Sequence, residues 1–248
     1  MLGIAVITCN RDRQLSDTLL ALERHTTTPC RLVVADDGST DFTTGFCREQ
    51  RIPCITGANR GVAWNKNRAL FALISVLRCS VAILIEDDTV PTADGWDRDW
   101  IDAARRWGHV NLAGDWFPAG HIASGAGTPG DPILSTHVSG QVEAFTREAI
   151  MYGGYLDPRF RGFGHGHVEH TRRLIRAGYG GIDGPQPLYR LIRSPITVNH
   201  ASSASNPADL ARNATLIAEL LEDHSPRLPW RDEAEMALFR AEIAAARL

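Results

Sequence analysis

Short apolar runs alternate with stretches of helical periodicity over the first 115 residues, and this alternation restricts the fold more than any other feature. The apolar runs cover residues 2–8, 31–35, 52–56, 81–85 and 110–113. Helical stretches separate them, over residues 16–25 with Ser16 as the cap, from residue 42, over 62–77 and over 96–107. Strands and helices that alternate at this spacing are joined by right-handed crossovers. We therefore predict an α/β fold with a mostly parallel twisted sheet flanked by helices.

The pattern changes after residue 115. Residues 115–135 are rich in Gly, Pro and Ala and predict a long loop, which in a compact domain is usually functional. A strand over 137–145, helices over 147–152 and 168–177, and a short strand over 197–200 follow. Two further helices, over 208–222 and 232–248, suit packing on the domain or on a partner, so an oligomer would form through them. We expect one domain over 1–204, with halves 1–115 and 116–204, and a C-terminal helical extension over 205–248.

Composition excludes several classes of protein. The formal net charge of −3 gives no general electrostatic case for nucleic acid or an anionic membrane. Five cysteines without Cys-x-x-Cys spacing suggest neither a disulfide framework nor a zinc knuckle, so reduced thiols are expected. We see no basic leader, and the apolar stretches are shorter than the roughly 20 residues that cross a bilayer. The expectation is a cytoplasmic protein without a membrane span.

Three consecutive acidic residues end the fourth predicted strand. Glu86, Asp87 and Asp88 directly follow the apolar run over 81–85. Open α/β sheets bind ligands at the carboxyl ends of their strands. Neighbouring carboxylates repel one another, and a hard divalent ion that also binds a substrate phosphate would neutralise them. The alternative is an inert acidic turn in solvent.

The other early strands also end in polar residues. Thr8, Asn10 and Arg11 follow the first strand, and Asp36 and Asp37 follow the second in an Asp-Asp-Gly-Ser turn. The third strand is followed by Asn59 and Gly61 in a loop, and by Asn65 and Arg68 on the next helix. Four successive strands therefore deliver acidic, amide and basic groups to one edge of one sheet.

This ordered set resembles the inverting glycosyltransferases of family 2, which have the GT-A fold. The resemblance covers roughly residues 2–200 and is strongest over 4–91. It implies transfer of a sugar, with inversion, from a nucleoside diphosphate donor to an acceptor hydroxyl. A UDP-sugar is the favoured donor, and the type of acceptor stays open. The resemblance also implies Mn²⁺ or Mg²⁺ as cofactor.

The resemblance assigns roles on the donor side residue by residue. Thr8, Asn10 and Arg11 match the segment that lines the nucleotide, and Asp36 and Asp37 match the acidic pair that contacts base and ribose. Asn59, Gly61, Asn65 and Arg68 match the stretch that approaches the nucleotide and diphosphate. Asp88 is the expected metal ligand, with Glu86 and Asp87 facing the ribose or supporting the ion through water. His200 is a candidate further ligand. Structural alternatives are helix capping by Asp37 and a surface ion pair for Arg68.

The acceptor side departs from the family. Residues 173–179 match it closely, but Gly166-His167 stands where most members carry Glu-Asp, and Glu169 comes two residues later. The base is therefore either Glu169, or His167 oriented by Glu169. His165, His167 and His170 are alternatively a separate zinc site or helix-capping groups. Trp116 is either a sugar-stacking residue or part of the core.

Two other functions compete with sugar transfer. A sugar-nucleotide nucleotidyltransferase of related architecture would begin with a glycine-rich, basic loop after the first strand, where this chain has Thr8, Asn10 and Arg11. A non-catalytic nucleotide- or carbohydrate-binding module would keep the fold and lose the base, and the change at Gly166-His167 is consistent with that.

Overall fold

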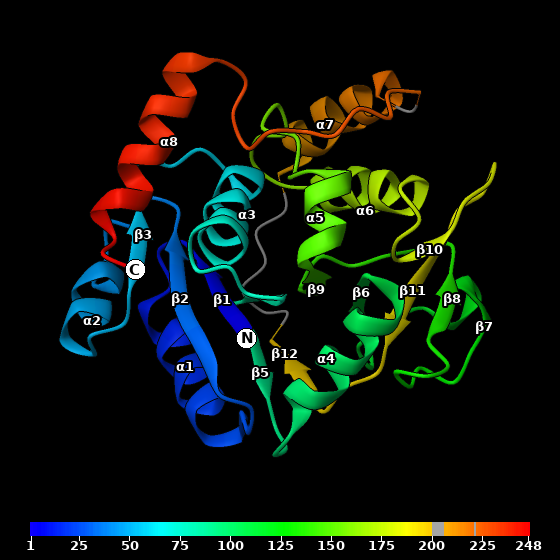
Figure 1. The fold of residues 1–248 in the computed structure, drawn as a ribbon, viewed down its shortest axis with the longest axis horizontal. Helices are drawn as coiled ribbons and strands as arrows, with labels where there is room; N and C mark the ends of the chain where they lie inside the picture. The colour runs from blue at the N-terminus through cyan, green and yellow to red at the C-terminus, as the bar shows by residue number, and fades with distance from the viewer. Residues whose placement is uncertain (200–205, 221) are drawn as a thin grey trace.

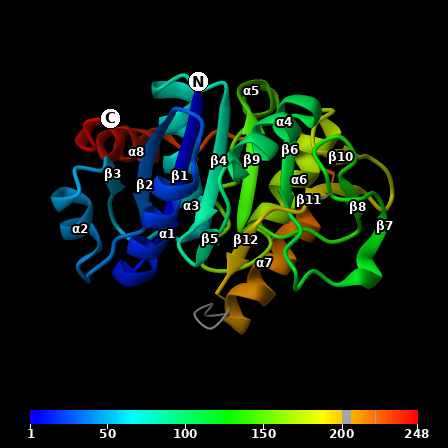
Figure 2. The ribbon, with the colours of Figure 1, turned by 90° about the horizontal axis from the view of Figure 1, so that it is seen from below.

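The computed structural model describes residues 1–199, 206–220 and 222–248. Its centre is a ten-stranded sheet in the order β3-β2-β1-β4-β9-β6-β11-β8-β7, with β10 paired to β11 (Figures 1 and 2). These strands are β1 (Leu2–Thr8), β2 (Cys30–Asp36), β3 (Cys54–Thr56), β4 (Val81–Glu86), β6 (His109–Leu112), β7 (Ile122–Ser124), β8 (Ile133–Ser135), β9 (Val142–Thr146), β10 (Gly181–Ile182) and β11 (Leu188–Ile192). A separate pair joins β5 (Thr89–Pro91) and β12 (Ile196–Val198).

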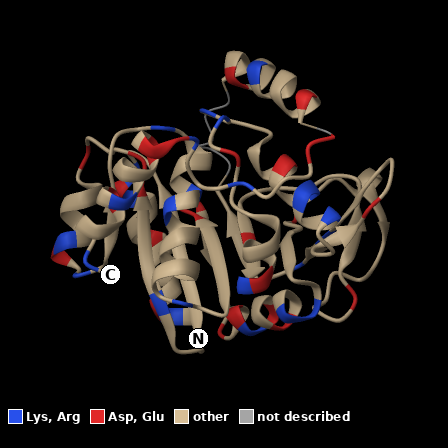
Figure 3. Ribbon diagram, turned by 45° about the horizontal axis from the view of Figure 1, so that its top comes forward, with Lys and Arg blue, Asp and Glu red and all other residues tan. Residues whose placement is uncertain are grey.

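Helices cover both faces of this sheet. They are α1 (Asp12–His25), α2 (Thr43–Glu49), α3 (Val62–Leu70), α4 (Trp96–Trp107), α5 (Arg147–Gly153), α6 (Gly166–Arg176), α7 (Pro207–Glu219) and α8 (Glu233–Ala245). A π-helix, η1 (Phe71–Val76), continues α3, and a short 3-10 turn, η2 (Ala119–His121), precedes β7. Several of the α-helices carry both acidic and basic residues (Figure 3).

The sheet confirms the predicted α/β fold. Strands β1, β2, β3 and β4 are mutually parallel. The antiparallel strand β9 lies between β4 and β6 and pairs with both, so β6 and the adjoining parallel strand β11 run in the same direction as β4. The carboxyl ends of β1, β2, β4, β6 and β11 therefore share one edge with the amino end of β9.

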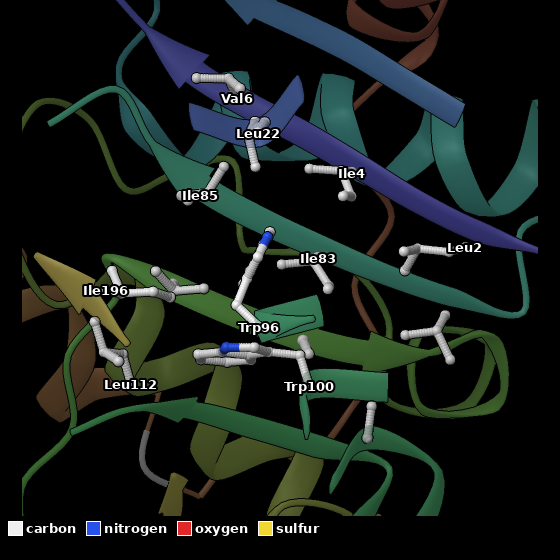
Figure 4. Packing of buried hydrophobic residues seen from close by; sticks show 14 of the residues in the cluster. Leu2, Ile4, Val6, Leu22, Ile83, Ile85, Trp96, Trp100, Leu112 and Ile196 are labelled. Carbon is white, nitrogen blue, oxygen red and sulfur yellow. The ribbon is translucent and has the colours of Figure 1, made fainter. Parts of the chain in front are cut away.

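Two tryptophans of α4 anchor one face of the sheet. Trp96 and Trp100 are buried against apolar side chains of the strands, among them Ile83 and Leu112 (Figure 4). Their indole N–H groups donate to Thr26 Oγ1 at 3.3 Å and Ser194 Oγ at 3.0 Å, so no polar atom of these rings is buried unpaired. Burial of a large apolar side chain of this kind stabilises the folded state by about 1.5–3 kcal/mol. The opposite face packs against α3, η1, α5 and α6.

Several expected boundaries differ from the structure. Helix α1 begins at Asp12, so Ser16 lies inside it and is not its cap. The expected loop over 115–135 contains the β7–β8 hairpin, and the strand expected over 137–145 is confined to Val142–Thr146. Strand β11, the parallel neighbour of β6, was not predicted.

The C-terminal helices pack on the rest of the chain. Figure 1 shows α8 beside β3 and α3, where Phe239 contacts Trp64 at a ring-centroid distance of 5.3 Å and Phe71 at 5.5 Å. Helix α7 contacts α6 and the loop over 161–164.

All five cysteines are free thiols, as expected. Among the described residues, no helix has the length and apolar character needed to cross a membrane.

Candidate active site

The acidic triplet lies beside the end of β1. Ile7 pairs with Glu86 in the β1–β4 register, which brings Thr8 next to Asp87. Thr8 Oγ1 donates to Asp87 Oδ2 at 2.7 Å. Arg11 Nη1 lies 3.0 Å from Asp87 Oδ1 and 3.4 Å from Asp88 Oδ2, so one guanidinium contacts both carboxylates. Burial raises the pKa of Asp87, although Thr8 and Arg11 act against that rise.

A cleft of about 390 Å³ opens at this edge of the sheet. Nine of the predicted donor-side residues line it: Thr8, Arg11, Asp37, Asn59, Gly61, Asn65, Glu86, Asp87 and Asp88. A further depression of about 480 Å³ between α1 and β2 is lined mainly by apolar side chains and contains none of the predicted site residues. The cleft at the carboxyl edge is therefore the candidate active site.

The structure separates the roles of the two aspartates that follow β2. Asp36 is fully buried and accepts hydrogen bonds from the Ser39 N–H at 3.2 Å and Thr56 Oγ1 at 2.6 Å, outside the cleft. Asp37 lines the cleft, and its two oxygens accept from the backbone N–H groups of Arg60 at 2.9 Å and Gly61 at 2.8 Å. Burial raises the pKa of Asp37, while those two N–H groups oppose the rise. Of the pair, only Asp37 is placed to contact a ligand.

The loop after β3 forms one wall of the cleft. Gly61 has φ +92°, and a Cβ there would lie 2.6 Å from the Gly162 nitrogen, so the position requires glycine. Asn59 donates to Cys9 Sγ at 3.4 Å. Asn65 Nδ2 donates to the Ala35 carbonyl at 2.7 Å, which fixes the first turn of α3 to the end of β2.

Besides Asp36, two further predicted donor-side residues lie outside the cleft. Arg68 is fully buried, with Glu242 of α8 on one side and Asp37 on the other, so it does not face the space that a phosphate would occupy. Asn10, at φ 55°, joins two loops: its N–H donates to Ser39 Oγ at 2.7 Å and its Oδ1 accepts from the Thr40 N–H at 2.7 Å. Both side chains position the cleft wall rather than line it.

A buried lysine forms an ion pair with the first residue of the acidic triplet. Lys66, the only lysine of the chain, lies 2.8 Å from Glu143 Oε2 and 3.4 Å from Glu86 Oε1, and it also bonds the Gly140 carbonyl. Burial disfavours the ammonium, but the attraction of Glu143 and Glu86 outweighs it and raises the pKa of Lys66. The Glu86 side chain keeps 32% of its surface exposed, yet desolvation raises its pKa to about 7 against the opposing effect of Lys66.

The two candidate bases have different environments. Glu169 is buried, and its Oε1 and Oε2 are each 2.9 Å from nitrogens of Arg173, which also bonds the Tyr155 carbonyl. Both carboxylate oxygens are therefore engaged within α6, where they orient the arginine that bonds the preceding segment. His167 packs on Gly140 near Lys66. Burial, and then Lys66, lower the pKa of His167 to about 3, so its imidazole is neutral at physiological pH.

The remaining histidines do not form the alternative zinc site. His170 Nε2 bonds the Gly154 carbonyl at 2.9 Å in the interior, and burial lowers its pKa well below the usual value. No group of three His, Cys, Asp or Glu side chains in residues 1–199, 206–220 and 222–248 is arranged to hold a metal ion. His200 lies outside the described residues. Asn199, which precedes it, donates its backbone N–H to the Asp88 carbonyl at 2.8 Å.

Sequence reasoning missed part of the site. Phe163, Asn206 and Asp209 line the cleft from the second half of the chain, and Lys66 and Glu143 lie behind it. Two of these five residues stand out in the sequence, because Lys66 is the only lysine and Glu143 interrupts an apolar strand.

Trp116 is 39% exposed on the loop after β6, with its ring centroid 5.9 Å from that of Phe117, so it is not a core residue.

Comparison with known proteins defines the class. A family model described as glycosyl transferase family 2 matches residues 3–120. Among solved structures, S. aureus TarS 1–349 in complex with UDP is 15% identical with a TM-score of 0.60, covering 98% of this chain and 70% of that one. The mannosyltransferase PcManGT from Pyrobaculum calidifontis, in complex with GDP-Man and Mn²⁺, is 15% identical with a TM-score of 0.60, covering 99% and 73%.

A third structure, GalNAc-T7 with UDP, GalNAc and Mn²⁺, is 14% identical with a TM-score of 0.64 and covers 98% of this chain and 54% of that one. The chain also spans 43% of a longer TarS chain. A comparison with curated protein sequences gave no match. The shared architecture is the GT-A fold, and fold and family model together make the chain a glycosyltransferase. Residues 3–120 match the model of glycosyltransferase family 2, the family that the sequence resembles.

Proposed function

We propose that the chain transfers a sugar from a nucleoside diphosphate donor to an acceptor hydroxyl, with inversion and with the help of a divalent metal ion. The observation that carries this proposal is the presence of Asp37 and the pair Asp87–Asp88 in one cleft, at the carboxyl edge of β2, β1 and β4. A carboxylate for the base, and an acidic pair that would bind the diphosphate through a metal ion, match the two ends of a nucleoside diphosphate.

The donor side follows from this placement. Asp37 accepts from a base N–H, Asn59 and the Gly61 backbone lie along the nucleotide, and Glu86 faces the ribose. UDP-sugar is the favoured donor; UDP is present in the similar structures of TarS and GalNAc-T7, whereas PcManGT contains GDP-Man. Domain halves 1–115 for the donor and 116–204 for the acceptor are part of the same proposal, and the family match ends close to that boundary.

The residues at the acidic end suit a hard cation. Asp87 and Asp88 present carboxylate oxygens to the cleft, the ligand type that Mn²⁺ and Mg²⁺ prefer, and His200 is the proposed further ligand. A bound ion would stabilise the negative charge of the departing diphosphate. Arg11 contacts both carboxylates, so it would share their charge with the ion and hold them in place.

The proposed base is His167 or Glu169. With its pKa lowered to about 3, the imidazole of His167 is neutral but a weak proton acceptor, and both oxygens of Glu169 already bond Arg173. With His167 as the base, Glu169 would keep Arg173 and the start of α6 in position. His167→Gln is expected to reduce kcat with little change in donor KM.

Donor hydrolysis and transfer test the proposal. Wild-type protein is incubated with UDP-, GDP- and dTDP-sugars, with and without Mn²⁺, and release of the nucleoside diphosphate is measured. We expect Mn²⁺-dependent release that Asp88→Asn abolishes, while Asp102→Asn, at the exposed surface of α4, leaves it unchanged. Release of pyrophosphate from a nucleoside triphosphate would instead indicate a nucleotidyltransferase, and binding without turnover would indicate a binding module.

A further inference from the structure

Helix α8 reaches the nucleotide end of the cleft through one carboxylate. Glu242 Oε2 lies 3.0 Å from Arg68 Nε, and Glu242 Oε1 lies 3.0 Å from Arg68 Nη2, a bidentate pair between residues far apart in the chain. Trp64 Nε1 also donates to Glu242 Oε2 at 3.2 Å. Both partners of the ion pair are buried, so the geometry is shielded from solvent and salt.

The same arginine contacts the base-binding carboxylate and its loop. Arg68 Nη1 lies 3.3 Å from Asp37 Oδ1 and 3.0 Å from the Asp36 carbonyl, and Arg68 Nη2 donates to the Ala58 carbonyl at 3.1 Å. Asp37 in turn holds the N–H groups of Arg60 and Gly61. A continuous set of polar contacts therefore runs from α8 through Arg68 to the wall of the cleft.

The loop after β3 is shaped around this contact. An ideal Cβ at Gly57 would lie 2.1 Å from Glu242 Oε1 and 2.6 Å from Arg68 Nη2, so only glycine leaves room for the pair. The Arg60 guanidinium stacks over Trp64 at 4.8 Å and approaches Glu235 of α8 at 3.9 Å. Residues on both sides of the loop thus face α8.

We propose that α8 is part of the donor site and that Glu242 is a positioning residue for nucleotide recognition. By fixing Arg68, Glu242 holds Asp37 and the 57–61 loop in the conformation that accepts the base. The inference rests on the proposed function for the identity of the ligand. The second helix of the expected C-terminal extension over 205–248 then supports the wall of the nucleotide pocket.

The test compares two substitutions in one helix. Glu242→Gln keeps the shape of the side chain and removes the charge that binds Arg68. Phe239→Leu loosens the aromatic packing of α8 on Trp64 and Phe71 but leaves the ion pair in place. Glu233→Gln removes a charge from an exposed position of the same helix and serves as the neutral control. All are studied at a temperature where each variant is fully folded.

For Glu242→Gln we expect the Kd for UDP, measured with Mn²⁺, to rise about tenfold, with kcat at saturating donor within about twofold of wild type. Phe239→Leu and Glu233→Gln are expected to bind UDP as wild type does. Wild-type affinity in Glu242→Gln, or an equal loss in Phe239→Leu at matched stability, would overturn the positioning role.

A second measurement does not depend on the ligand. In the ligand-free protein, hydrogen exchange at the Arg60 and Gly61 amides should accelerate in Glu242→Gln and not in Phe239→Leu. If wild-type protein binds none of UDP, GDP and dTDP, the proposed function fails, and amide exchange alone decides whether Glu242 positions the loop. Unchanged exchange at both amides would refute the positioning claim.

Discussion

The buried Lys66–Glu143 pair gives the sharpest stability prediction. Glu143 is fully buried on β9, and Lys66 Nζ lies 2.8 Å from its Oε2, while Asn111 Nδ2 is farther away at 3.4 Å from the other oxygen. Lys66→Met keeps most of the side-chain volume and leaves the carboxylate buried without a cation. Breaking a buried ion pair in this way costs about 3–5 kcal/mol.

The expected loss of unfolding free energy in Lys66→Met corresponds to a lower melting temperature. A chain of 248 residues unfolds with an entropy of about 0.5 kcal/mol/K, so Lys66→Met should lower Tm by about 6–10 °C. Glu143→Gln alone leaves the ammonium beside Glu86 and should cost less. The double variant removes both charges and should recover much of the loss, because the two substitutions share one interaction.

The assay is urea and thermal unfolding of the wild type, both single variants and the double variant. Arg106→Met is the matched control, since Arg106 pairs with Asp102 at 2.9 Å on the exposed face of α4. A surface pair of this kind contributes less than about 1 kcal/mol. A loss from Lys66→Met no larger than that from Arg106→Met, or fully additive losses in the double variant, would refute the reasoning.

Three further predictions concern single positions. Burial lowers the pKa of His109 to about 4, so the unfolded chain binds more protons than the folded one between about pH 6.5 and 4. The contribution of His109 to the free energy of unfolding should therefore fall by about 3 kcal/mol over that range. His109→Gln should flatten the pH dependence of the urea midpoint, and His224→Gln, at an exposed position, should not. Gly61→Ala should cost about 1–2 kcal/mol and weaken UDP binding because φ is +92°, whereas Gly120→Ala, in open space, should do neither. Asn213→Ala removes three hydrogen bonds to the carbonyls of Arg161, Phe163 and Gly164, so trypsin should cleave after Arg161 faster than in wild type. An unchanged pH profile, a neutral Gly61→Ala or an unchanged cleavage rate would contradict the respective prediction.

The donor half of the fold was predictable because its signals are local. Apolar runs with polar ends mark β1, β2 and β4, and parallel pairing brings those ends together without further information. The helix over Trp96–Trp107 was predicted to the residue, since its tryptophans and the bounding glycines are strong local signals. The short β7–β8 hairpin and β11 carry weak patterns and depend on their neighbours for their conformation.

The partners of the site residues could not be predicted, because they come from distant parts of the chain. Arg68 has the charge that a diphosphate needs, and only the structure reveals that Glu242 already binds it. Glu169 has the right chemistry for a base, but Arg173, one turn later, takes both its oxygens. Charge and spacing identified which side chains matter, whereas burial and pairing determine what each of them can do.

The most direct test of the account is the position of a metal ion and a nucleotide in the cleft. Crystals grown with UDP and MnCl₂ should give an anomalous Mn²⁺ peak at the Asp88 carboxylate, with the diphosphate beside it and the uracil ring next to Asp37. The same experiment on Asp88→Asn should show no peak. A nucleotide bound elsewhere, or a base placed away from Asp37 with no Mn²⁺ at Asp88, would contradict the proposed donor site.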